Sequence, residues 1–181
     1  NNDGFIDERD ETFIGLSDLP ENTYAISLGA NWKGIGLSLM FQGVDHVSRY
    51  YDAEAMYAFV GGGKVKEHHL DRWNPAVGEQ QNLANAKYPL LHYDSYGNHN
   101  QRQNSFFLKN GAFCRLKNIE VSYSLPEKWI KHVWMTQCRF YVNANNLITW
   151  DHLDGLTDPE NNGSNKYPIC KTVNFGVNIQ F

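Results

Sequence analysis

Hydrophobic residues alternate with small or polar residues along several stretches of this chain. In the closing stretch KTVNFGVNIQF, each odd-numbered residue from Val173 to Phe181 is apolar, and Asn, Gly or Gln stands between them. A period of two is typical of a β-strand whose two faces meet different surroundings. The pattern predicts strands at about 22–32, 35–43, 112–125, 136–149 and 171–181. The first two are separated only by Lys33 and Gly34, which predicts a tight hairpin.

The polar face of these predicted strands carries few charges. Asn, Ser, Gly, Thr and Gln fill most of its positions, and Glu120 and Arg139 are the exceptions. A soluble β-sandwich would turn a charged face to water, whereas a membrane barrel has a polar interior and an apolar exterior. The alternation alone leaves these two folds equally open. Aromatic residues near the predicted strand ends are typical of the interfacial girdles of membrane barrels; they are Trp32, Tyr123, Trp129, Trp134, Trp150 and Phe181.

The connections between the predicted strands are alternately short and long. Residues 33–34 and 126–135 are short, whereas 44–110 and 150–169 are long. Outer-membrane barrels have short periplasmic turns and long extracellular loops. We therefore predict an all-β fold made of the C-terminal antiparallel strands of a large transmembrane β-barrel, with extracellular loops at 1–21, 44–110 and 150–169. Five strands are too few to close a barrel, so we expect a portion of a larger one.

Composition excludes several other classes of protein. A net charge of −4 argues against nucleic-acid binding, and no apolar run is long enough for a transmembrane helix. Cys114 and Cys170 are expected two strands apart, about 10 Å, which is too far for a disulfide, and Cys138 is expected near the opposite end of its strand. We therefore predict three free thiols. The chain opens on NNDGFIDERDE, without an initiator Met or a signal peptide, from which we expect a processed protein or a fragment.

Several segments in order resemble one protein family. They include YAISLGANWKGIGLSLMFQG, RWNPAV, RLKNIEVSYSLP, FYVNANNLITW and the ending YPICKTVNFGVNIQF. Together they are similar to the C-terminal end of SusC/RagA-type TonB-dependent outer-membrane transporters. That resemblance implies an importer of oligosaccharides or peptides in the bacterial outer membrane, paired with a SusD-like surface lipoprotein. It also implies contact with outer-membrane lipid, and with the TonB complex through a region upstream of Asn1.

The same resemblance implies that the last strand is read by the barrel-assembly machinery, through Phe175 and Phe181. We expect no enzymatic activity, because the chain has no G-x-S-x-G, no HExxH and no complete phosphate-binding loop. The alternative function is a soluble carbohydrate-binding module, a β-sandwich stabilised by calcium.

The opening residues resemble an EF-hand calcium loop entered at its third position. Gly4 would supply the sharp turn, and oxygen ligands would alternate around it. The first ligand position lies before the chain begins, and the last is Asp where Glu is usual. The other interpretation is an acidic turn that binds no metal. The predicted calcium ligands are Asn1, Asp3, the carbonyl of Phe5, Asp7 and Asp10.

The predicted loop 44–110 is rich in aromatic residues beside His, Asn and Gln. Flat rings with amide neighbours suit contact with a sugar or peptide. They equally suit a loop that packs on itself or on the lipoprotein partner. The candidate residues for ligand or partner contact are Tyr50, Tyr51, Trp73, Tyr93 and Tyr96.

Overall fold

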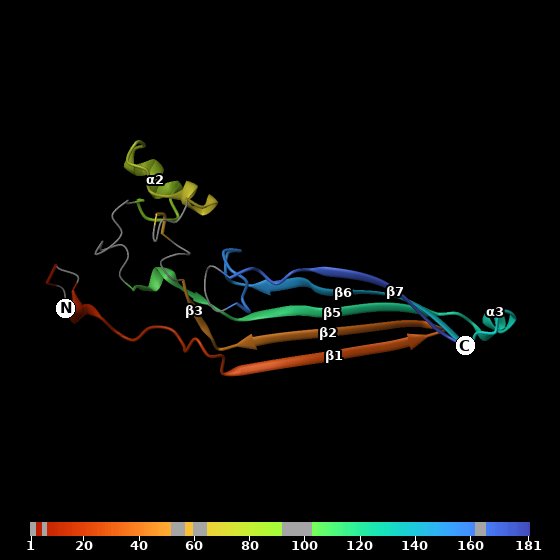
Figure 1. Ribbon diagram of the computed structural model, residues 1–181. Coiled ribbons are helices and arrows are strands. Elements are labelled where there is room, and N and C mark those ends of the chain that lie inside the picture. Colours follow the sequence, from red (N-terminus) through yellow and green to blue (C-terminus); the bar gives the residue numbers. More distant parts are fainter. Residues whose placement is uncertain (1–2, 5–6, 52–56, 60–64, 92–102, 162–165) are drawn as a thin grey trace.

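The computed structural model describes residues 3–4, 7–51, 57–59, 65–91, 103–161 and 166–181. Its main element is an antiparallel sheet with the strand order β1-β2-β5-β6-β7 (Figure 1). Within this sheet each strand pairs with the next one in chain order, as in a meander, and β3 and β4 form a separate two-stranded sheet. The all-β fold class predicted from the sequence is confirmed. The strands are β1 (Asn22–Trp32), β2 (Ile35–Asp45), β5 (Phe113–Ser124), β6 (Gln137–Asp151) and β7 (Thr172–Gln180).

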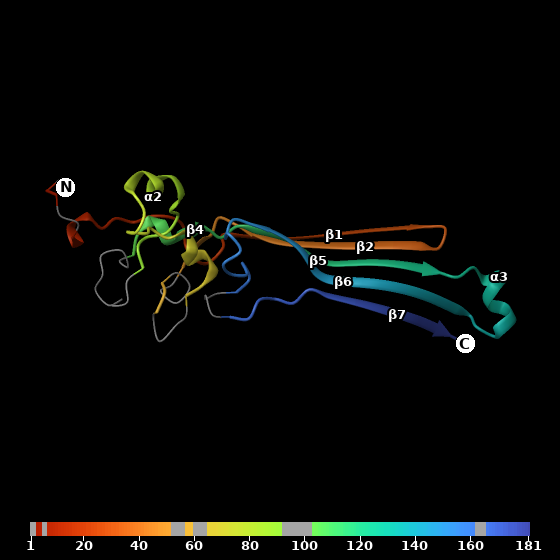
Figure 2. The ribbon, with the colours of Figure 1, turned by 90° about the horizontal axis from the view of Figure 1, so that it is seen from above.

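The remaining elements lie at the two ends of this sheet (Figures 1 and 2). At one end, which we call the loop end, the chain forms η1 (Glu8–Asp10), β3 (Ser48–Tyr50), η3 (Glu67–Asp71), α2 (Glu79–Asn85), η5 (Ser105–Phe107) and β4 (Leu108–Asn110). At the other, the turn end, lie the β1–β2 turn, α3 (Glu127–Ile130) and η6 (Lys131–Val133).

Two features of the connections differ from the sequence prediction. The range 44–110, predicted to be irregular, contains the ribbon of β3 and β4 and the helix α2. Three-residue strands are too short to show an alternation, so the pattern could not reveal them. Strands β2 and β6 also run two residues beyond their predicted ends, to Asp45 and Asp151, which shortens the loops that follow.

The β1–β2 hairpin turns through Lys33 and Gly34, which have φ angles of 48° and 87°. Positive φ at both central residues is the conformation that matches the twist of a two-residue hairpin. Gly34 has a second reason to be glycine, because a Cβ there would lie 2.8 Å from the carbonyl oxygen of Ser124. The turn therefore packs directly against the end of β5.

Strand register brings the apolar residues of all five strands into rows on one side, which we call the apolar face. One row contains Trp32, Ile35, Tyr123, Phe140 and Val177. The next row contains Ala30, Leu37, Val121, Val142 and Phe175. The opposite side, the polar face, carries the alternating residues, among them Ser38, Glu120, Asn143 and Asn174.

A β-bulge at Lys117 keeps this sorting intact along β5. The register shifts between Leu116 and Asn118, so Lys117 has no partner residue on β2 or β6. The extra residue reverses the parity of the strand, as bulges do. In a regular strand Leu116 and Ile119 would lie on opposite faces, because two residues stand between them. The bulge places both on the apolar face.

Glycine opposite tyrosine is used twice in the sheet. Gly176 is paired with Tyr141, and Gly43 with Tyr24. In each pair the tyrosine ring occupies the space that a Cβ on the glycine would fill. The ring covers the glycine backbone, which is how aromatic residues compensate for glycine within a sheet.

We predict that Gly176→Ala destabilises the sheet. The new methyl group would overlap the Tyr141 ring, and such overpacking costs about 1–3 kcal/mol of unfolding free energy. The measurement is the urea midpoint of unfolding of the detergent-purified protein, taken from the loss of the fast-migrating folded band on an unheated gel. Gly29→Ala is the matched control, because a Cβ there has its nearest contact at 3.8 Å. Equal midpoints for the two variants would contradict the role given to Tyr141.

Candidate functional site

The apolar face is exposed along its length. Val173, Phe175, Val177 and Ile179 of β7 are exposed by 52%, 79%, 52% and 48%. No second layer of described structure covers them. A continuous apolar surface of this extent marks contact with a membrane or another protein.

Aromatic residues lie at both ends of the apolar face, with aliphatic residues between them. At the loop end Tyr24 is near the edge, and the rings of Phe41 and Trp150 stack with centroids 6.5 Å apart. At the turn end stand Trp32 and Tyr123. This order is that of the lipid-facing side of a membrane barrel, where aromatic girdles flank an aliphatic band.

No helix among the described residues has the length and hydrophobicity needed to cross a membrane.

The polar face is linked across strands by side-chain amides. Asn118 Nδ2 donates to Asn145 Oδ1 at 2.9 Å, and Asn145 Nδ2 donates to Thr172 Oγ1 at 3.3 Å. The two charged residues noted in the sequence form a pair, in which Arg139 Nη2 donates to Glu120 Oε1 at 2.5 Å. The face is therefore polar and nearly neutral, which suits a water-filled interior.

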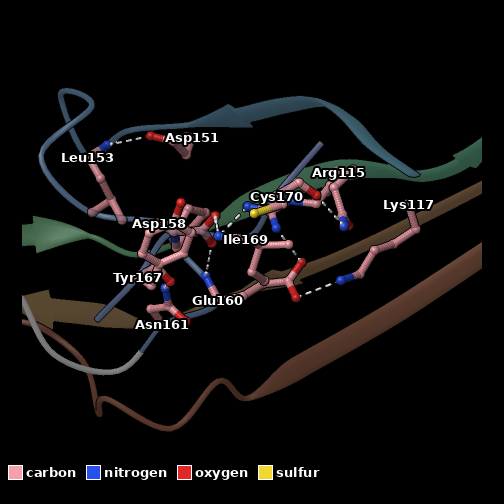
Figure 3. Close-up of polar contacts among 12 residues, drawn as sticks. Arg115, Lys117, Asp151, Leu153, Asp158, Glu160, Asn161, Tyr167, Ile169 and Cys170 are labelled. Carbon is pink, nitrogen blue, oxygen red and sulfur yellow. Dashed lines mark hydrogen bonds and ion pairs between the residues drawn. The ribbon is translucent and has the colours of Figure 1, made fainter. Parts of the chain in front are cut away.

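A group of four charged residues, the charge cluster, lies where the polar face meets the loop end (Figure 3). Arg115 on β5 is 2% exposed, and its Nη2 lies 2.8 Å from Asp158 Oδ1. Its Nη1 lies 3.1 Å from Glu160 Oε1. The other carboxylate oxygen of Glu160 lies 2.6 Å from Lys117 Nζ, on the β-bulge. The charges balance, as a buried ionic group requires.

The charge cluster fixes the β6–β7 loop against the sheet. Asp158 also accepts hydrogen bonds from the backbone of Glu160 at 3.0 Å and of Ile169 at 3.3 Å. Its carboxylate thus joins β5 to both arms of the loop (Figure 3). The loop consequently lies over one end of the polar face.

The charge cluster was not predicted from the sequence. Arg115 and Asp158 are far apart in the chain, and the segment RLKNIEVSYSLP, which begins at Arg115, gives no sign of a buried ion pair. The available signal was the pair Lys117-Asn118, which breaks the alternation where the bulge places a charge on the polar face.

The described loops pack around a small apolar core formed by Tyr51, Phe107 and Leu153. The Tyr51 hydroxyl donates to the Leu153 carbonyl at 2.5 Å. Burial raises the pKa of Tyr51 far above its ordinary value, so the hydroxyl stays protonated and remains a donor. This core joins the β2–β5 connection to the β6–β7 loop.

The aromatic candidates for ligand contact differ in how far they are exposed. Tyr51 is 4% exposed and serves the loop core, whereas Tyr50 is 39% exposed. Trp73 is half-buried, and its backbone N–H donates to Tyr88 at 2.8 Å. Tyr93 and Tyr96 lie outside the described residues. Contact of this group with a ligand or partner stays a prediction.

The acidic turn at the start of the chain is organised around Arg9. Its Nη2 lies 3.0 Å from Asp3 and 2.6 Å from Asp7. Asp7 caps η1, and Asp10 accepts the backbone N–H of Asp7 at 3.0 Å. Asn1 and Phe5 of the predicted ligand set lie outside the described residues. Within the described residues no three His, Cys, Asp or Glu side chains are grouped for a metal ion, and the calcium site stays a prediction.

Two other groups identified in the sequence can be placed. The cysteines are free thiols, with Cys138 buried, Cys114 half-buried and Cys170 exposed. Phe175 and Phe181 are exposed by 79% and 81%. Their recognition by the assembly machinery stays a prediction.

Comparison with known proteins gives one consistent result. The chain is 25% identical over 196 residues to the TonB-dependent receptor P3 of Formosa agariphila, covering 98% of the chain and 18% of that receptor. It matches the RagAB peptide importer with a TM-score of 0.72 in the closed-closed state and 0.69 in the open-open state. Both structures are 25% identical and are matched over 98% of the chain and 19% of theirs. No family model matches the chain.

The sheet is thus similar to part of the barrel of TonB-dependent transporters. The resemblance to SusC/RagA-type transporters found in the sequence is confirmed. The chain spans about a fifth of the length of these relatives. The relatives are named as a receptor and as importers, not as enzymes.

We predict that Asp158→Asn releases the β6–β7 loop. Removing one member of a buried ion pair costs about 3–5 kcal/mol, because its partner stays buried and unbalanced. Limited proteolysis of the folded protein should show faster cleavage within 152–170. Asp154→Asn is the matched control in the same loop. Asp154 forms an exposed pair with Lys109 at 3.2 Å, and such pairs contribute about 0–1 kcal/mol. Equal cleavage rates would contradict the anchoring role of the charge cluster.

Proposed function

We propose that this chain forms wall strands and outer loops of a TonB-dependent importer in the bacterial outer membrane. The observation that carries the proposal is the register of the apolar face. Apolar residues from five strands form continuous rows, they remain exposed, and aromatic residues flank them. A soluble β-sandwich would bury these rows beneath a second sheet, so the alternative of a carbohydrate-binding module is not favoured.

The two ends of the sheet support an orientation in the membrane. The short connections at the turn end face the periplasm, and the long connections at the loop end face outside, as is general for such barrels. The polar face then lines the interior. In this orientation the charge cluster holds the β6–β7 loop over the outer mouth of the channel.

The partners follow from the similarity to RagAB and from the family resemblance. A SusD-like surface lipoprotein contacts the outer loops, and energy reaches the channel from the TonB complex through another part of the protein. The barrel-assembly machinery inserts the strands into the outer membrane. The substrate is a peptide or an oligosaccharide, and the RagAB peptide importer supports the peptide.

We predict that Leu39→Arg blocks stable insertion of the protein, whereas Ser38→Arg does not. Leu39 lies near the middle of β2 within the apolar face, and Ser38 lies beside it on the polar face, opposite Glu120. Arginine on the lipid-facing side of a barrel costs about 2–4 kcal/mol near the bilayer midplane. The measurement is the fraction of folded, heat-modifiable protein in outer-membrane fractions. Equal loss in both variants, or in neither, would contradict the assignment of the faces.

Import itself is tested with labelled substrates in cells. Cells that produce the complete protein and its lipoprotein partner should accumulate fluorescent oligopeptides faster than cells that lack them. Dissipating the proton motive force should abolish the difference, because TonB-dependent transport requires it. Faster accumulation of oligosaccharides only would overturn the peptide assignment. Uptake that is unaffected by the uncoupler would overturn the importer proposal.

A further inference from the structure

The turn end of the sheet exposes tryptophan side chains on its helical connection. Trp129 and Trp134 are exposed by 65% and 89%, and Val133 by 51%. Ile130, between them, is 3% exposed and fixes α3 to the rest of the protein. Tryptophan concentrates at the membrane–water interface, where its ring meets apolar groups and its N–H stays hydrated. The exposed side chains of α3 and η6 therefore suit the surface of a bilayer.

The same end carries an excess of positive charge although the whole chain has a net charge of −4. The two turns contribute Lys33, Lys128 and Lys131, with Glu127 as their acidic residue. Lys131 and Glu127 form an exposed pair at 3.1 Å. Lys33 Nζ lies 4.8 Å from the centroid of the Trp32 ring, at the edge of the apolar face. Lys33 thus borders the first row of apolar residues, and Lys128 and Lys131 lie on α3 and η6 at the same end of the sheet.

A groove of about 650 Å³ begins at that row. The space is lined mainly by apolar side chains, including the rings of Tyr123, Phe140 and Phe175. A Cβ on Gly34, in the turn that contains Lys33, would lie 3.5 Å from the Tyr123 ring. Groove and basic turn are consequently neighbours. The other apolar residues of the apolar face that line the groove are Ile35, Val121, Val142 and Val177.

We propose that the turn end binds an anionic phospholipid of the periplasmic leaflet. The groove receives an acyl chain, and the lysines bind the phosphate of the headgroup. Charge complementarity and the contiguity of groove and Lys33 select this occupant, because a zwitterionic lipid carries the same phosphate beside a cation that offsets its attraction to the lysines. A basic residue near a membrane surface contributes attraction to anionic lipid. The inference rests on the proposed function for the orientation of the sheet.

The test is native mass spectrometry of the complete detergent-purified protein titrated with phosphatidylglycerol or phosphatidylcholine of identical acyl chains. We expect the wild type to prefer phosphatidylglycerol about tenfold, which corresponds to about 1.4 kcal/mol, because Glu127 partly neutralises Lys131. The variant K33Q/K128Q/K131Q should lose the preference. The matched control K87Q/K166Q/K171Q removes three exposed lysines at the loop end and should keep it.

A second pair of variants tests the groove itself. Val177→Trp fills the groove and should weaken binding of both lipids. Val173→Trp, on the same strand and face with the same 52% exposure, lies outside the groove and should bind as the wild type does. Equal binding by these two variants would overturn the acyl-chain site.

Other outcomes separate this inference from the proposed function. Normal membrane insertion without any lysine-dependent lipid preference overturns the inference alone. A protein that stays folded and monodisperse without detergent, and binds neither lipid, overturns the proposed function as well. A dimer that Val177→Trp abolishes, in the absence of lipid preference, would assign the groove to a second copy of the chain.

Discussion

Cross-strand register is the constraint on which the rest of this structure depends. Each long strand alternates by itself, but a slip of one residue would send its apolar side chains to the opposite face. The pairing of β1, β2, β5, β6 and β7 holds all five in phase. The bulge at Lys117 restores the phase of β5 where its sequence breaks it. The result is a sheet with one apolar face and one polar face.

Backbone hydrogen bonding explains why such a sheet suits a membrane. In hydrocarbon each backbone polar group needs a partner within the protein, which only helices and closed barrels provide. The edge strands β1 and β7 each pair with one described strand, and their outer edges face no described strand. Further strands of a larger barrel would pair with the backbone groups on these outer edges. This agrees with the comparisons, in which the chain spans about a fifth of the length of its relatives. The charge cluster adds a second level of order, because it fixes a long loop at the mouth of the polar face.

The long strands were predictable from the sequence because their pattern is local. Alternation over nine or more residues, as in Val173 to Phe181, defines a strand and its faces without knowledge of its partners. The hairpin at Lys33-Gly34 was predictable for the same reason. The loop core and the charge cluster were not, because they join residues distant in the chain. Nothing near Arg115 in the sequence points to Asp158, and nothing near Tyr51 points to Leu153. The sequence of a loop does not distinguish an aromatic residue that is buried, as Tyr51 is, from one that is exposed, as Tyr50 is.

The most direct test is to measure which residues of β7 meet lipid. Single cysteines at 173–180, introduced after replacement of Cys114, Cys138 and Cys170, are spin-labelled in the complete protein in bilayers. Accessibility to oxygen, which concentrates in lipid, is compared with accessibility to a water-soluble nickel complex. The account predicts oxygen accessibility at the odd-numbered positions and nickel accessibility at the even-numbered ones. Uniform accessibility to nickel, or protection of the odd-numbered positions from both reagents, would contradict it.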